Sequence, residues 1–196
     1  MATRVDSKKR IVAKLTRMRV MKASDLQKSG SGRVILGRLV DEGEIISLGT
    51  GLYASPSLDP FVASVIAVSK FYPKTVVSNL TALVIHRLSD ERLDRIDVDI
   101  ERNQNIRNQL MRVHRVPKKR LIGIEKMNFS GQTISIYDVE RTLCEAYRLD
   151  QGGPIFFKAL KRYLKNKKPD TKKTLKYDRL LRTRVTYHLQ QELADD

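Results

Sequence analysis

The sequence has little cysteine, few aromatic residues and no long apolar run. Its single cysteine, Cys144, excludes an internal disulfide framework and a zinc site built from several cysteines. Aromatic residues make up 6% of the 196 positions and tryptophan is absent, so the core must consist mainly of aliphatic side chains. No apolar run reaches the roughly 18 residues of a membrane span, and the N-terminus lacks the apolar stretch of a signal peptide. These absences predict a cytoplasmic protein that does not enter the membrane.

Positive charge is the most prominent feature that the sequence does have. Thirty-eight lysine and arginine residues face twenty-two acidic ones, which leaves a net charge of +16. The excess lies in three blocks, with +6 over residues 1–55, +7 over residues 102–126 and +9 over residues 161–184. Blocks of this kind favour discrete contact surfaces for a polyanion such as a nucleic acid, because binding releases the counterions of its phosphates.

The first 54 residues predict three helices followed by a hairpin. Apolar residues recur with helical spacing over 5–18, a short helix is indicated over 22–28, and a third begins after Ser31, which suits an N-cap. Two short apolar segments, 44–48 and 52–54, flank a turn that contains two glycines, which is typical of a hairpin. This order is that of a winged helix-turn-helix, and we place such a DNA-binding domain at residues 1–57.

In a winged helix the third helix enters the major groove and the wing approaches the backbone or the minor groove. Helical geometry places Ile35, Leu36, Leu39 and Val40 on the inner side of the third helix. The predicted base contacts lie on its other side. The residues predicted to contact DNA are Ser31, Arg33, Val34, Gly37 and Arg38 of this helix, Lys8, Lys9, Arg10 and Lys22 at phosphates, and Thr50 in the wing. For Gly37 two interpretations stay open, a weak helix position or a close approach to the groove wall.

Two prolines, Pro56 and Pro60, predict a linker and a second domain over residues 58–196. This domain is predicted to be α+β, with a small, mostly antiparallel sheet and a basic helical segment at its C-terminal end. Strands are expected over 96–101, 111–116, 124–129 and 132–137, and helices over 61–71, 78–88, 138–149, 155–164 and 175–189. A basic patch that could extend the DNA contact is formed by Lys118, Lys119, Arg120, Lys167, Lys168, Lys172 and Lys173.

No sequence pattern argues for an enzyme, a metal or a cofactor. Asp97, Asp99 and Glu101 alternate on one strand face, and paired carboxylates can hold Mg²⁺ for phosphoryl transfer or nucleic-acid cleavage. A solvated strand face gives the same pattern, with the carboxylates pairing to Arg112 and Arg115 of a neighbouring strand. A metal-dependent nuclease that uses the three carboxylates therefore stays as an alternative, as does an RNA-binding module.

Several fragments, taken in order, resemble the AbiEi-type antitoxins, which are transcriptional regulators of type IV toxin–antitoxin (abortive-infection) systems. In the N-terminal part these fragments are Asp25-Leu26, the turn at 29–32, the motif over 36–43 that contains Arg38 and Gly43, and the sequence 51–53. In the second domain they are the segments 78–88, 96–98 and 137–143.

The resemblance implies two activities. The winged helix would bind inverted repeats in the promoter of its own operon and repress it, as a monomer that binds DNA cooperatively. The second domain would counter a nucleotidyltransferase-like toxin without forming a stable complex with it.

Overall fold

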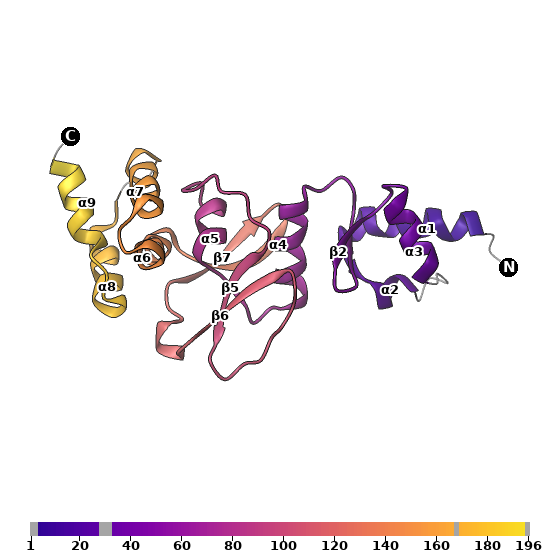
Figure 1. The fold of residues 1–196 in the computed structure, drawn as a ribbon, viewed down its shortest axis with the longest axis horizontal. Helices are drawn as coiled ribbons and strands as arrows, with labels where there is room; N and C mark the ends of the chain where they lie inside the picture. Colours follow the sequence, from indigo (N-terminus) through magenta and orange to yellow (C-terminus); the bar gives the residue numbers. More distant parts are fainter. Residues whose placement is uncertain (1–3, 28–32, 167–168, 195–196) are drawn as a thin grey trace. The chain divides into compact units, whose positions relative to one another are not determined.

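The computed structural model describes residues 4–27, 33–166 and 169–194. The chain divides into two units that are each compact (Figure 1). The first contains the residues up to Pro73 together with the short segments Asn108–Leu110 and Phe129–Gln132. The second contains Lys74–Arg107, Met111–Asn128 and the residues from Thr133 onward.

The first unit combines helices with a small antiparallel sheet. Its elements are α1 (Arg4–Met18), β1 (Val20–Lys22), α2 (Ala23–Gln27), α3 (Arg33–Asp41), β2 (Ile46–Gly49), β3 (Leu52–Ala54) and α4 (Pro60–Phe71). The strand order is β1-β3-β2, with Val20 and Ile46 both opposite Ala54. The expected hairpin is therefore present as β2 and β3, while β1 is an additional short strand.

Both faces of this sheet are covered. Met21 and Tyr53 point to one face and pack with the apolar residues of α1, α2 and α3. Val20 and Ala54 point to the other face, where they pack against α4. Each face of the sheet therefore has its own apolar cluster.

The prolines at 56 and 60 do not separate α4 from the first unit. Pro60 is the first residue of α4, and the Asp59 carboxylate caps the helix by accepting hydrogen bonds from the amides of Phe61 (2.9 Å) and Val62 (3.1 Å). Proline suits this position because its missing N–H would have no helical partner there. The predicted boundary at 57/58 thus precedes α4, whereas the first unit extends to Pro73.

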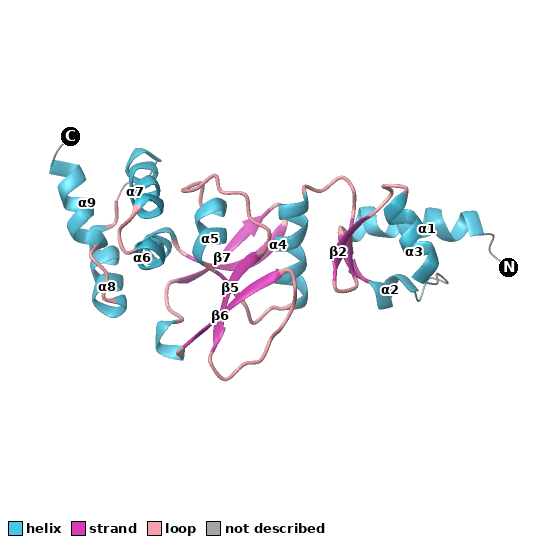
Figure 2. Cartoon of the chain, viewed as in Figure 1, coloured by secondary structure: helices cyan, strands magenta, loops and turns pink. Residues whose placement is uncertain are grey.

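The second unit contains a five-stranded sheet and the remaining helices (Figure 2). Its elements are β4 (Val76–Val77), α5 (Asn79–Ile85), β5 (Ile96–Glu101), β6 (Met111–Val116), the 3₁₀ helix η1 (Lys118–Arg120), β7 (Ile124–Phe129), β8 (Gln132–Tyr137), α6 (Val139–Asp150), α7 (Pro154–Asn166), α8 (Thr171–Leu181) and α9 (Val185–Ala194). The helices α5 to α9 share an apolar core that includes Leu83, Leu143, Phe156, Leu181 and Leu189.

The larger sheet is mixed, so the expectation of a mostly antiparallel sheet is wrong. The strand order is β6-β5-β4-β8-β7. β5 runs parallel to β6, and β4 runs parallel to β8, while β4 and β5 are antiparallel. Alternation of apolar and polar residues is the same in strands of either direction, and therefore the sequence pattern carried no information about direction.

The C-terminal helix predicted over 175–189 is in fact two helices, α8 and α9. Arg182 interrupts them with a left-handed backbone (φ 58°). The buried Asp178 side chain fixes the break, because it accepts hydrogen bonds from the amides of Val185 (3.1 Å) and Thr186 (2.7 Å). A carboxylate that satisfies the free amides of the next helix starts that helix anew.

Candidate functional site

The outward face of α3 is polar and exposed, as its helical periodicity predicted. Leu36 and Leu39 are buried, whereas Arg33 and Arg38 are exposed. Neither guanidinium forms an ion pair with another residue in the described part of the chain. Val34 lies on the same face and is 63% exposed. The face thus offers two exposed arginines beside an apolar group.

Gly37 lies among these residues on the exposed face of α3, and neither the packing nor the backbone there requires a glycine. A methyl group built on its α-carbon would meet no atom within 4 Å among the described residues. The helix geometry does not require glycine either, because its φ is not in the left-handed region. The contacts within the first unit therefore do not explain why this exposed helical position lacks a side chain.

The other residues predicted to contact DNA differ in their exposure and in their contacts within the protein. Lys9, Arg10 and Lys22 are exposed, and Lys22 lies over the ring of Phe71 at 5.1 Å. Lys8 forms an ion pair with Glu42 (2.5 Å). The Thr50 hydroxyl accepts a hydrogen bond from Asn108 Nδ2 (3.1 Å), which ties the β2–β3 turn to another segment of the first unit.

Some residues of the predicted basic patch are exposed, whereas others are half-buried or form ion pairs within the protein. Lys118 and Lys119 are exposed on η1 and Arg120 is half-buried, while Lys172 is exposed on α8. Lys173 Nζ instead lies 3.0 Å from Glu140 Oε2 and 3.3 Å from Asp138 Oδ2, so its charge is compensated within the second unit. Ser31, Lys167 and Lys168 lie outside the described residues.

The second unit holds a polar pocket that begins at β5. The expectation that the acidic face of this strand is solvated is wrong for two of its three carboxylates. Asp97 and Asp99 are each 2% exposed, and only Glu101 is half-buried. Helix α5 packs against β5, and residues on both faces of β5 are buried.

Parallel pairing with β6 supplies the cations next to these carboxylates. Arg112 lies opposite Asp97 and His114 lies opposite Asp99. His114 Nε2 lies 2.9 Å from Asp97 Oδ1, and Arg112 Nη1 lies 3.7 Å from the same oxygen. The hydrogen bond to Asp97 raises the pKa of His114. Arg112 thus pairs with the acidic face as predicted.

The predicted pairing of Arg115 is not found. This residue lies opposite Ile100, on the other face of the sheet, and its guanidinium donates to Asn105 Oδ1 (3.2 Å). Neighbouring residues of a strand point to opposite faces, so an arginine at an odd spacing from Arg112 cannot reach the same carboxylates.

Asp99 has neutral partners in place of cations. Its Oδ2 accepts a hydrogen bond from the Tyr137 hydroxyl (2.8 Å), while its Oδ1 is buried without a hydrogen-bond partner among the described residues. Burial raises the pKa of Asp99 because the charged form loses its hydration, and side-chain hydrogen bonds from Ser78 and Tyr137, both neutral, offset part of this increase.

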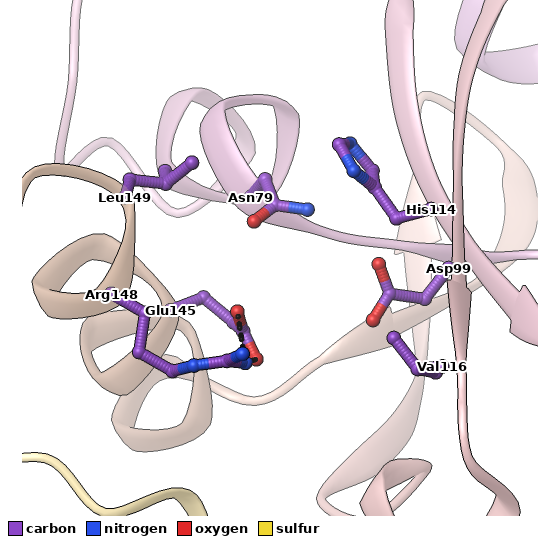
Figure 3. A pocket seen from close by; sticks show the side chains of 7 residues that line it. All are labelled: Asn79, Asp99, His114, Val116, Glu145, Arg148 and Leu149. Carbon is purple, nitrogen blue, oxygen red and sulfur yellow. Dashed lines mark hydrogen bonds and ion pairs between the residues drawn. The ribbon is translucent and has the colours of Figure 1, made fainter.

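A cavity of about 190 Å³ opens beside Asp99. Its wall consists of residues from α5, β5, β6 and α6 (Figure 3), namely Asn79, Asp99, His114, Val116, Glu145, Arg148 and Leu149. Arg148 Nη1 lies 3.2 Å from each carboxylate oxygen of Glu145. The buried Arg141 also donates to Glu145, and its guanidinium stacks on the Tyr137 ring at 4.3 Å. Each ionised group of α6 in this wall therefore has an ionic partner.

Sequence reasoning singled out the β5 carboxylates but missed Tyr137, Arg141 and Glu145. The fragment over 137–143 appeared only as part of a family resemblance. The spacing of Arg141 and Glu145 by four residues, which places both on one helix face, was the signal that could have paired them. That this face turns toward β5 depends on the packing of α6.

The three carboxylates of β5 do not form a metal centre. No group of three or more histidine, cysteine, aspartate and glutamate residues in the described part of the chain is arranged to hold a metal ion. Asp97 is already engaged by His114 and Arg112. Cys144 is buried, and burial raises the pKa of its thiol, so it does not supply a ready thiolate.

Comparisons with known proteins place the fold. No protein-family model and no curated protein matches the chain. Its structure is similar to the crystal structure of the RV2827C protein from Mycobacterium tuberculosis, with a TM-score of 0.60 and 16% sequence identity over 94% of this chain and 76% of that one. At this identity the likeness concerns the fold alone. No helix in the described ranges is both long enough and apolar enough to cross a membrane.

Proposed function

We propose that residues 4–54 form a winged helix-turn-helix and that the chain binds double-stranded DNA with α3 in the major groove. The observation that carries the proposal is the outward face of α3, where Arg33 and Arg38 are exposed and free of ion pairs among the described residues. Arginine can donate two hydrogen bonds to a guanine edge, and an aliphatic group such as Val34 can contact a thymine methyl. The excess positive charge of the first 55 residues supports the same partner.

The biological role that we propose is that of a repressor of its own operon and an antitoxin. This role rests on the resemblance to AbiEi-type antitoxins, with the winged helix acting at inverted repeats in the promoter. The second unit would counter a nucleotidyltransferase-like toxin encoded next to this gene. The chain itself carries out no reaction in this scheme.

Changing Arg33 and Arg38 together to Ala tests the DNA-binding proposal. We expect binding to DNA from upstream of the gene to weaken by roughly 1–3 kcal/mol for each lost base contact. Both side chains lie outside the apolar clusters, so the circular dichroism spectrum and the thermal midpoint should not change. A gel-shift titration measures the affinity.

The matched control replaces Arg92 and Arg95, two exposed arginines of the second unit, with Ala. It removes the same charge, and we expect it to leave binding nearly unchanged. Equal affinity of the folded Arg33/Arg38 variant and the wild type would rule out α3 as the contact helix.

Co-expression tests the antitoxin role. We expect a gene for a nucleotidyltransferase-like toxin next to this gene. Expression of that toxin should arrest growth, and co-expression of this chain should restore growth. The Arg33/Arg38 variant, supplied from a promoter that does not depend on repression, should restore growth equally well. Failure of both proteins to protect cells would contradict the antitoxin role while leaving DNA binding intact.

A further inference from the structure

The wall of the polar pocket contains one acidic oxygen that the fold does not use. Asp99 is 2% exposed, and its Oδ1 has no hydrogen-bond partner among the described residues. Figure 3 shows the Asp99 carboxylate facing the space bounded by Asn79, Glu145 and Arg148. Burial of a carboxylate oxygen without a partner opposes folding, since the hydration of that oxygen is lost and nothing replaces it. A group that donates to Oδ1 would offset this cost.

The other charges around the cavity are already paired. Glu145 is held by Arg148 and by Arg141. Asp97 is held through Oδ1 by His114 and by Arg112, while its Oδ2 is buried without a hydrogen-bond partner among the described residues. Of the two carboxylates in the wall, Asp99 and Glu145, only Asp99 has no cationic partner among the described residues. The Tyr137 hydroxyl, which donates to Asp99, is neutral.

The shape and lining of the cavity restrict the ligand. A volume of about 190 Å³ is below the roughly 300 Å³ at which sites for drug-sized ligands begin, so only a compact group fits. Val116 and Leu149 supply an apolar part of the wall that suits a short aliphatic stem. An anion would face the carboxylates of Asp99 and Glu145. A divalent metal would require more oxygen ligands than converge here.

We propose that this pocket binds the guanidinium or ammonium head group of a small amine or of a side chain inserted by a partner protein, with Asp99 Oδ1 as its acceptor. The head group donates to Asp99 while its aliphatic stem contacts Val116 and Leu149. The site lies within the second unit, and its existence does not depend on DNA binding by the first.

Binding should strengthen as the pH rises. Burial raises the pKa of Asp99, and the bond to Asp97 raises the pKa of His114, so at low pH the acceptor is neutral and the imidazole is cationic. Both changes oppose a bound cation. The other groups that face this region are Asn79 of α5, Asp97 of β5, Arg112 of β6, Tyr137 of β8, and Arg141, Glu145 and Arg148 of α6.

The experiment titrates the full-length protein with methylguanidinium chloride and follows the imidazole C–H signals by NMR. The chain has three histidines, of which only His114 lines the cavity, so His86 and His188 serve as internal references. Tetramethylammonium chloride at equal ionic strength is the control ligand because it carries the charge but cannot donate a hydrogen bond. We expect saturable shifts of His114 with methylguanidinium alone. Equal shifts with both salts would overturn the proposal.

Asp99→Asn tests the acceptor directly. It keeps the size of the side chain and removes its charge, and we expect the affinity for methylguanidinium to fall about tenfold to a hundredfold. Asp94→Asn removes an exposed carboxylate that pairs with Arg112 and should leave the affinity unchanged. Unchanged affinity of the Asp99 variant would overturn the proposal.

A second variant covers the case in which Asp99→Asn does not fold. Val116→Met fills part of the cavity from the wall and leaves the carboxylate in place, and we expect it to reduce binding. Wild-type affinity in this variant would overturn the proposal.

A further comparison separates the two sources of the head group, a free amine and a partner side chain. The affinity of agmatine is compared with that of an arginine-containing tripeptide with blocked ends. Tighter binding of the tripeptide indicates a partner side chain, and tighter binding of agmatine indicates a free amine.

Discussion

Asp97 and Asp99 stand two residues apart on the same face of β5, and both are buried, yet their surroundings differ. Asp97 has a histidine and an arginine as partners, whereas Asp99 receives a hydrogen bond from a tyrosine hydroxyl. A cation beside a buried carboxylate offsets part of the hydration energy that burial removes, whereas a neutral donor offsets less of it. Asp97 therefore affects the protonation of His114, and Asp99 affects the polar pocket.

At the residue scale we predict that Asp97→Asn lowers the pKa of His114 from its raised value. The hydrogen bond from the imidazole to the carboxylate is the largest cause of the increase, and an amide cannot stabilise the imidazolium in the same way. A pH titration of the His114 C–H signals measures the change. Asp94→Asn is the control, and an unaltered His114 titration in the Asp97 variant would contradict the assignment.

The same pair makes stability depend on pH. Because the pKa of His114 is raised in the folded state, the folded protein holds the proton more tightly than the unfolded chain, whose value lies near 6.5. This contribution to the free energy of unfolding is fully present below pH 6.5 and is lost as the pH rises through the folded value. Urea denaturation across this window should show a decline in the wild type that is smaller in the Asp97 variant.

At the scale of the element, α3 carries an exposed glycine for which the fold gives no reason. We predict that Gly37→Ala raises the free energy of unfolding by roughly 0.5–1 kcal/mol, because alanine has the higher helix propensity and the added methyl group meets open space. We also predict weaker DNA binding, since a methyl group would hold the helix away from the groove wall. Denaturation and gel-shift titrations measure the two effects separately.

The combination of the two results separates the interpretations of Gly37. A more stable protein with reduced affinity supports close approach of the helix to DNA. A more stable protein with unaltered affinity means that Gly37 is only a weak helix position. In that case α3 does not approach the groove wall closely at this residue.

At the scale of the whole molecule, the question is whether the basic blocks outside the first unit contact DNA. Residues 102–126 and 161–184 carry net charges of +7 and +9, and each phosphate contact adds about 0.9 to the slope of log affinity against log salt. We predict that Lys118→Gln with Lys119→Gln, or Lys167→Gln with Lys168→Gln and Lys172→Gln, reduces this slope for at least one block. Binding is measured across a salt series.

Lys173 is excluded from these variants because its ion pairs with Asp138 and Glu140 belong to the fold. The Lys173→Gln variant instead serves as a control, which we expect to lose stability more than salt dependence. If both multiple variants keep the wild-type slope, the blocks face another partner, such as the toxin or RNA.

The local order of helices and turns along the chain could be predicted from the sequence. The periodicity over 33–41 separated the buried Leu36 and Leu39 from the exposed Arg33 and Arg38, and the glycine turns located both hairpins. These features depend on residues that are close together in the chain. The spacing of such residues determines which side chains lie on the same face of a helix or strand.

The partners that cover those faces depend on tertiary contacts. The alternation of β5 was visible in the sequence, but the packing of α5 against β5 and the burial of Asp97 and Asp99 were not. Strand direction, the break at Arg182 and the attachment of α4 to the first sheet also came from contacts between distant residues. Periodicity records which residues lie together on an element, whereas burial depends on the partner that the element meets, and a single sequence does not name that partner.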